Sequence, residues 1–339
     1  METVARPLAR TNPSGLRAGA PLTRIDGPAD ALALVAEDLA AAELELRELV
    51  VSDVAEIPAI AGYLADAGGK RLRPALTALA RITLGIDRLL PRLMCTGELL
   101  HLGSLLHDDV VDDGLTRRGR PTAHRLHGAP VTVLTGDFCL ARAMLLAAEE
   151  GGHRAVTELG RAVTRMAEGE VLQLRRAHDL ATDVEGYLDV VDRKSAALIA
   201  WCAAAPAWMI GDDEAGEALA TFGRGVGRAF QLTDDVLDFR QNTGKTLGAD
   251  LRERKVTLPL IHAMERDPAL RAELQAGPPA EERLPALVDR VRSSGALDST
   301  LAVARGFVDE ALQALLVLPE GVGRDALAVL GTYLVERSR

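Results

Sequence analysis

Asp108–Asp113 reads Asp-Asp-Val-Val-Asp-Asp, and a partial repeat, Asp-Asp-Val-Leu-Asp-Phe, occupies Asp234–Phe239. Apolar stretches typical of helices precede both, Glu98–His107 before the first and Gly227–Thr233 before the second. Residues four apart share one face of a helix, so the first and fifth residues of each hexapeptide stack and repel each other. Two matching clusters predict that a divalent cation neutralises them, and all-oxygen ligands favour Mg²⁺. A pair of solvated acidic helix ends is the simpler alternative.

The composition favours a helical protein with an aliphatic core. Of 339 residues, 48% are hydrophobic but only 3% are aromatic, which suits helices packed through Ala and Leu. The net charge of −10 argues against a nucleic-acid partner, which would need a basic face. Three scattered cysteines without a Cys-x-x-Cys pair indicate reduced thiols and a cytoplasmic protein. We expect no membrane span, because the longest apolar run, Ala196–Ile210, is short and interrupted by Pro206.

The hydrophobic periodicity predicts an all-α fold. Residues 1–28 are expected to form a flexible arm, and residues 29–339 a single helical domain. We find no alternation typical of strands. The main helices are expected at about 29–49, 54–67, 74–85, 91–112, 131–149, 154–176, 184–205 and 214–239, with loops at 114–129 and 241–255.

The basic residues indicate a phosphorylated substrate. Of 39 Lys plus Arg, only Lys70, Lys194, Lys245 and Lys255 are lysines, and lysine is a compact point charge suited to a phosphate oxygen. Arg117-Arg118 follow the first acidic cluster, so each cluster has a cationic loop beside it. Ordinary surface ion pairs are the alternative. The chain contains neither a P-loop nor a strand followed by Gly-x-Gly-x-x-Gly. A diphosphate held by metal therefore suggests that the diphosphate is the leaving group.

With these motifs the chain closely resembles the trans-isoprenyl diphosphate synthases, the polyprenyl synthetase family, from about Ala61 to its end. Ser195 stands where Thr is usual, Arg120 where Lys is common and Arg254 where Gly is common, and all three departures are mild. The matching elements, in order, are Gly68–Pro74, His101, Leu105–Asp113, Arg117–Gly119, Gly136-Asp137, Glu168–Leu174, Lys194-Ser195, Phe230–Asp238, Gly244-Lys245 and Asp250–Pro259.

The resemblance implies an isoprenoid synthase-type bundle of mostly antiparallel helices around a deep central cavity, as a homodimer. It also implies a Mg²⁺-dependent, head-to-tail condensation of isopentenyl diphosphate with an allylic prenyl diphosphate. About three Mg²⁺ ions would be bound by Asp108, Asp109, Asp112, Asp234, Asp235 and Asp238. The allylic diphosphate would contact Arg117, Lys194, Lys245 and Lys255, and isopentenyl diphosphate would contact Lys70, Arg73, His101 and Arg118. Gln231 and Ser195 would stabilise the allylic cation.

Other functions are compatible with parts of this pattern. A class I terpene cyclase shares the metal-triggered ionisation, but it would not need the cationic pocket around Lys70, Arg73 and His101. A non-catalytic subunit of a heteromeric synthase would be expected to carry degraded acidic motifs, and these are intact. A short-chain synthase with a C20 product remains an alternative.

The residues before the first cluster predict the product length. Gly103 and Ser104 lie about one helical turn, roughly 6–7 Å, before Asp108. Short-chain members of the family often carry an aromatic floor here, so small residues predict a medium- or long-chain product. Phe138 or Met144 could supply a floor instead. We therefore expect Gly103→Phe to shorten the product, and an unchanged product length would contradict this pocket.

Overall fold

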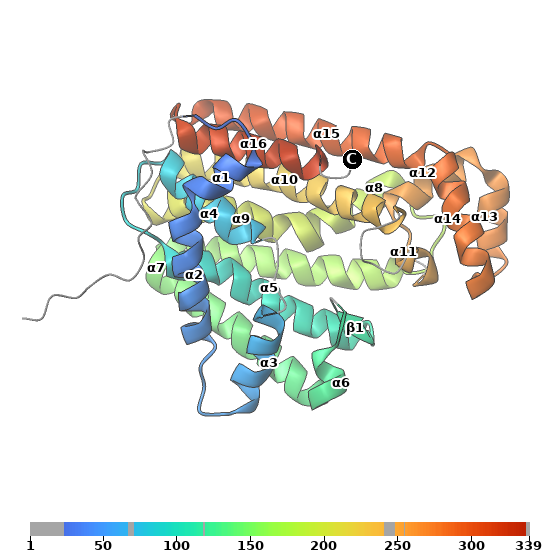
Figure 1. Cartoon of the computed structure of the whole chain (residues 1–339), viewed down its shortest axis with the longest axis horizontal. Helices are drawn as coiled ribbons and strands as arrows, with labels where there is room; N and C mark the ends of the chain where they lie inside the picture. The colour runs from blue at the N-terminus through green and yellow to red at the C-terminus, as the bar shows by residue number, and fades with distance from the viewer. Residues whose placement is uncertain (1–23, 67–70, 118, 241–247, 254, 337–339) are drawn as a thin grey trace, which may run out of the picture.

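α-Helices dominate the computed structural model, which describes residues 24–66, 71–117, 119–240, 248–253 and 255–336 (Figure 1). The predicted all-α fold is confirmed. In these ranges the strands are a two-residue antiparallel ladder, in which Thr116 lies opposite Pro121. The first elements are α1 (Pro28–Leu34), α2 (Ala36–Leu49), α3 (Glu56–Ala65), α4 (Leu72–Thr83), α5 (Pro91–Val111), β1 (Thr116–Arg117), β2 (Arg120–Pro121) and α6 (Ala123–His127).

The second half of the chain supplies the longest helices and the outer layer. In Figure 1, α15 and α16 run side by side along the upper edge, and α13 and α14 close one end. The elements are α7 (Ala129–Arg176), α8 (Val184–Val191), a π-helical turn (Asp192–Ala196), α9 (Ala197–Met209), α10 (Asp213–Asp238), α11 (Ala249–Arg252), α12 (Leu258–Arg266), α13 (Pro268–Gln275), α14 (Leu284–Ser293), α15 (Ala296–Ala314) and α16 (Val322–Glu336), with 3₁₀ turns at Glu281–Arg283 and Leu315–Val317.

The core lies between α5, α7, α9 and α10. α7 packs along α5 on one side and α9 on the other, while α10 packs between α9 and α15. The core side chains are mainly Ala, Leu and Val, as the composition predicts, and Trp201, Phe222 and Phe239 are among the few large rings buried in it. This arrangement brings the ends of α5 and α10 to the same part of the molecule.

α7 is interrupted at Gly152, within the break that the sequence predicts between two helices. Gly152 has non-helical backbone angles (φ 74°, ψ −170°), so the 48 residues form two helical segments joined at a kink. Glycine adopts this conformation without steric cost, which lets the chain change direction there. By length and composition alone α7 could cross a membrane. Its packing against α5 and α9 makes it a helix of the bundle.

The prediction that Pro206 ends its helix is wrong. α9 continues through Pro206 to Met209. Proline has no N–H, so the carbonyl of Cys202, four residues earlier, loses its helical partner. The hydroxyl of Thr77 on α4 donates to that carbonyl at 2.8 Å instead. A hydrogen bond from a neighbouring helix therefore satisfies the acceptor that the proline frees.

We expect Thr77→Val to lower the free energy of unfolding by about 1–3 kcal/mol, because it leaves the buried Cys202 carbonyl without a donor. The measurement is urea unfolding followed by circular dichroism. Thr83→Val is the matched control, since the Thr83 hydroxyl bonds the Leu79 carbonyl within its own helix. Equal losses in the two variants would contradict this role of Thr77.

Candidate active site

The first acidic cluster occupies the C-terminal end of α5. Asp109 is 3% exposed, and its Oδ1 accepts a 2.7 Å hydrogen bond from Arg117 Nε. Its Oδ2 is also buried, and no described residue donates a hydrogen bond to it. Burial raises the pKa of Asp108 to about 6, against the opposing effect of Lys194. The end of α5 therefore holds a buried carboxylate oxygen to which no described residue donates a hydrogen bond.

The second cluster occupies the C-terminal end of α10. Asp235 is buried, and burial is the main reason that its pKa is raised to about 7. Two donors hold its carboxylate: the Tyr187 hydroxyl, and the Gln231 amide at 2.8 Å. Asp238 accepts a hydrogen bond from the backbone N–H of Asp250 at 3.0 Å. Both clusters thus stand at the negative end of a helix dipole, where an added carboxylate is unfavourable and a cation is favourable.

A cavity of about 500 Å³ joins the two clusters. Asp112 reaches it from α5, Asp235 from α10 and Asp250 from α11. It is large enough for the head of a phosphorylated substrate, and both acidic and basic side chains line its wall. Of the predicted site residues, the structure brings together Asp112, Lys194, Ser195, Gln231, Asp235 and Lys255 around it.

The described lysines of the site are paired with carboxylates. Lys194 contacts Glu170 of α7, and Lys255 lies 2.7 Å from Glu253 and 3.6 Å from Asp112. Burial works to lower the pKa of Lys255, but the neighbouring carboxylates outweigh it and raise the pKa. A diphosphate would therefore compete with these carboxylates for the two lysines.

The π-helical turn presents Lys194 and Ser195 to the cavity. Wider helical turns of this kind are frequent at functional sites. Asp192, at its start, is buried and is bound by three arginines: Arg165 of α7, and Arg224 and Arg228 of α10. These contacts fix the turn from the face opposite the cavity.

A hydrogen-bond chain links this turn to the second cluster. The Ser195 hydroxyl donates to Gln231 Oε1 at 2.7 Å, and the Gln231 amide donates to Asp235. Tyr187 binds the other oxygen of Asp235. The sequence pattern missed Tyr187, Asp250 and Glu170 as site residues. Glu170 and Asp250 lie inside matching motifs, whereas nothing local distinguishes Tyr187.

The remaining predicted residues lie elsewhere or outside the described ranges. Lys70, Arg118 and Lys245 fall outside the described residues. Among those described, Arg73 and His101 do not line the cavity and lie nearer the N-terminal half of α5. Arg73 Nε is buried, and no described residue accepts a hydrogen bond from it.

Gly103 faces the neighbouring helix. A Cβ atom placed on it would lie 2.8 Å from the carbonyl oxygen of Gly136 on α7 and 3.4 Å from the Cβ of Cys139. A side chain at Gly103 would therefore meet the backbone of α7, and the effect of Gly103→Phe on product length stays a prediction. Ser104, one position later, is half-buried, and its hydroxyl bonds the His101 carbonyl.

The acidic residues suit magnesium. No group of three or more His, Cys, Asp or Glu in the described chain is arranged as a preformed metal centre. Mg²⁺ needs only one or two carboxylates, because water and substrate phosphate complete its shell. The buried Asp109 Oδ2, to which no described residue donates a hydrogen bond, is an oxygen that a cation would satisfy.

A helical bundle whose cavity is lined by carboxylates from two acidic clusters and by lysines suits an enzyme that acts on a phosphorylated substrate. Residues 54–290 match the polyprenyl synthetase family. The chain belongs to this family, so the resemblance seen in the sequence is confirmed.

Similar proteins carry related names. An all-trans-nonaprenyl-diphosphate synthase (geranyl-diphosphate specific) of Rhodobacter capsulatus is 37% identical over 92% of this chain and 99% of its own. The octaprenyl diphosphate synthase of Escherichia coli is 36% identical over 90% and 98%. A Caulobacter crescentus polyprenyl synthase, solved with calcium and isoprenyl diphosphate, is 39% identical over 93% and 100%, with a TM-score of 0.87.

We expect Gly103→Ala to lower the free energy of unfolding by about 1–3 kcal/mol, because the new methyl group overpacks the contact with Gly136. The measurement is chemical unfolding at one pH. Gly160→Ala on α7 is the control, since its Cβ would meet Met144 at an ordinary 3.8 Å. If both variants were equally stable, α5 and α7 would not be as closely packed as described.

Proposed function

We propose that this protein condenses isopentenyl diphosphate with an allylic prenyl diphosphate to make a medium- or long-chain all-trans polyprenyl diphosphate. The observation that carries the proposal is the cavity between α5 and α10. Asp112 and Asp235 line this cavity together with Lys194, Gln231 and Lys255. These are the groups that a departing diphosphate and an allylic cation require.

The chain's own residues bind and orient the leaving diphosphate. Lys194 and Lys255 supply positive charge at the cavity wall, and Arg117 donates a hydrogen bond to Asp109 of the first acidic cluster. As in the family it resembles, about three Mg²⁺ ions would be held by the two carboxylate sets, Asp108, Asp109 and Asp112 on one side and Asp234, Asp235 and Asp238 on the other. When bound, the metal neutralises charge that develops on the diphosphate. Each well-placed electrostatic group of this kind lowers the activation free energy by roughly 3 kcal/mol.

The same wall stabilises the organic half of the reaction. Ser195 donates to Gln231 Oε1, which fixes the amide with its carbonyl dipole beside the cavity. A fixed dipole of this sign favours the allylic cation. The double bond of isopentenyl diphosphate then attacks the cation, and the departed diphosphate accepts the final proton. Arg73 and His101, with Lys70 and Arg118, would hold the second substrate.

The similar proteins support a product longer than C20. A nonaprenyl and an octaprenyl diphosphate synthase are 37% and 36% identical to this chain. The alternative is a C20 product, and a geranylgeranyl pyrophosphate synthetase of Geoglobus acetivorans is 30% identical, with a TM-score of 0.82. A heptaprenyl diphosphate synthase component 2 of Bacillus subtilis, 32% identical, makes a second subunit a further alternative.

We propose that the enzyme is a cytoplasmic homodimer. The cysteines of the chain are buried free thiols, as a reducing compartment favours. Leu134 and Leu145 on α7 are 65% and 47% exposed, and their spacing of eleven residues puts them on one face. Two exposed leucines on one face of the first segment of α7 suit an interface with a second copy.

A product assay tests the proposed function. Purified protein is given Mg²⁺, labelled isopentenyl diphosphate and, separately, allylic primers of C5 to C20, and the products are dephosphorylated and sized. We expect a ladder ending at C30 or beyond that EDTA abolishes. A clean stop at C20 would select the short-chain alternative. No condensation by folded protein would contradict the proposal and point to a missing subunit.

We expect Tyr187→Phe to raise the Mg²⁺ concentration for half-maximal activity by about tenfold or more, the usual effect of losing a residue that orients a metal ligand. The reason is the lost hydrogen bond to Asp235. Tyr333→Phe on α16 is the control, since Tyr333 is 39% exposed on an outer helix. An unchanged Mg²⁺ dependence in Tyr187→Phe would show that Tyr187 does not position Asp235 for metal.

A further inference from the structure

Arg71 holds a backbone conformation that its side chain disfavours. It is the N-cap of α4, with φ 47° and ψ 32°, in the left-handed region. A Cβ atom crowds the following carbonyl there, so glycine or asparagine is the usual choice. Such strain persists only where the surroundings over-determine the residue, and it concentrates at functional sites.

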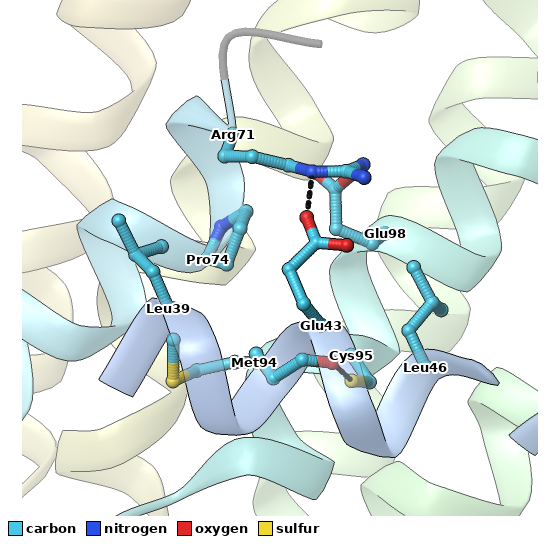
Figure 2. A pocket seen from close by; sticks show the side chains of 9 residues that line it. Leu39, Glu43, Leu46, Arg71, Pro74, Met94, Cys95 and Glu98 are labelled. Carbon is cyan, nitrogen blue, oxygen red and sulfur yellow. Dashed lines mark hydrogen bonds and ion pairs between the residues drawn. The ribbon is translucent and has the colours of Figure 1, made fainter. Parts of the chain in front are cut away.

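The surroundings of Arg71 are three other helices. Figure 2 shows its guanidinium above Glu43 of α2 and beside Glu98 of α5, with the dashed line marking the pair with Glu43. Nη1 lies 3.0 Å from Glu98, and Nη2 donates to the Ala65 carbonyl at the end of α3 at 3.3 Å. The Arg71 side chain is 20% exposed and that of Glu98 9%. A planar fork can satisfy these partners at once, which lysine cannot.

Arg71 itself is not suited to bind a phosphate. Its one positive charge already faces the carboxylates of Glu43 and Glu98. The three side chains together carry a net negative charge, so an incoming diphosphate would be repelled. The role of this cluster must therefore be exerted through its neighbours.

Those neighbours are residues expected to bind isopentenyl diphosphate. Arg73 follows two residues later in the first turn of α4, and His101 follows Glu98 by one turn of α5. The start of α4 touches α5 at this level, since a Cβ on Gly97 would lie 3.7 Å from the Cβ of Arg73. The Arg71–Glu98 pair thus fixes the spacing between the helix turns that carry Arg73 and His101.

We propose that Arg71, held by Glu43 and Glu98, is a positioning residue that sets Arg73 and His101 for the diphosphate of isopentenyl diphosphate. This inference rests on the proposed function. It separates the subsite for isopentenyl diphosphate, tied to α2 and the start of α4, from the allylic subsite at the ends of α5 and α10. Loss of the cluster should weaken the binding of isopentenyl diphosphate and leave the binding of the allylic substrate unchanged.

The same helix supplies a matched control. Arg81, in the last turn of α4, also binds a carboxylate of α2: its Nε lies 2.8 Å from Asp38 Oδ1, and its Nη2 lies 3.1 Å from Asp38 Oδ2. Its side chain is 11% exposed, so the pair is at least as buried as that of Arg71. Arg81 stands at the opposite end of α4 from Arg73. Arg81→Lys therefore tests what breaking a buried arginine pair between α4 and α2 does by itself.

The experiment compares Arg71→Lys, Glu43→Gln and Arg81→Lys with the unmodified protein. KM for isopentenyl diphosphate, KM for the allylic primer, kcat and thermal unfolding are measured for each. We expect Arg71→Lys to raise KM for isopentenyl diphosphate about tenfold, a modest effect for a displaced binding group, with KM for the primer nearly unchanged. Glu43→Gln, which leaves Arg71 and its backbone intact, should also raise KM for isopentenyl diphosphate, but by a smaller factor.

Arg81→Lys should lower the unfolding temperature without changing the ratio of the two KM values. The positioning role is overturned if Arg71→Lys and Glu43→Gln behave like Arg81→Lys, since Arg71 would then be an ordinary structural ion pair. Failure of the proposed function is a separate result, because it would appear as absent condensation in the unmodified protein.

Discussion

Like-charge repulsion at the ends of α5 and α10 is the constraint on which the rest of the structure depends. Carboxylates there are disfavoured by their neighbours, by burial and by the helix dipoles. The protein offsets part of this with contacts from outside the two helices. Arg117 binds Asp109, Tyr187 binds Asp235, and the backbone of Asp250 binds Asp238. The uncompensated part is charge that a bound cation would neutralise.

The scaffold holds these ends together by close helix packing. Small residues let α10 approach the π-helical turn and α9: a Cβ on Gly227 would lie 2.7 Å from the Cα of Ala196. At that separation Gln231, one turn further along α10, reaches Ser195. The aliphatic core provides the stability that the charged ends do not, and it does so on the faces of α5 and α10 that point away from the cavity. Because core and site occupy different faces of these helices, a core with few aromatic residues can support a site with many buried charges.

Local patterns predicted what depends on local chemistry. The two acidic hexapeptides, the helices around them and the cationic neighbours follow from residue type and spacing, and the family resemblance follows from their order. Gly103 and Pro206 show the limit. Helical spacing tells which residues share a face, but not that Gly136 of α7 occupies the face of Gly103. Nor could it show that Thr77, 125 residues from Cys202 in sequence, satisfies the carbonyl that Pro206 frees. Tyr187 was missed for the same reason, because its partner Asp235 is distant in the chain.

The charges around the cavity also determine how its ligands depend on one another. Among the described residues of its wall, Asp112, Asp235, Asp250 and Glu253 face Arg176, Lys194 and Lys255. A diphosphate alone would meet a surface with more negative than positive charge, and its lysines would already be paired. Divalent cations alone would meet carboxylates partly neutralised by those lysines. Each ligand would remove charge that opposes the other, so a metal ion and a diphosphate would bind cooperatively, and thermodynamic linkage would make the gain in affinity equal in both directions.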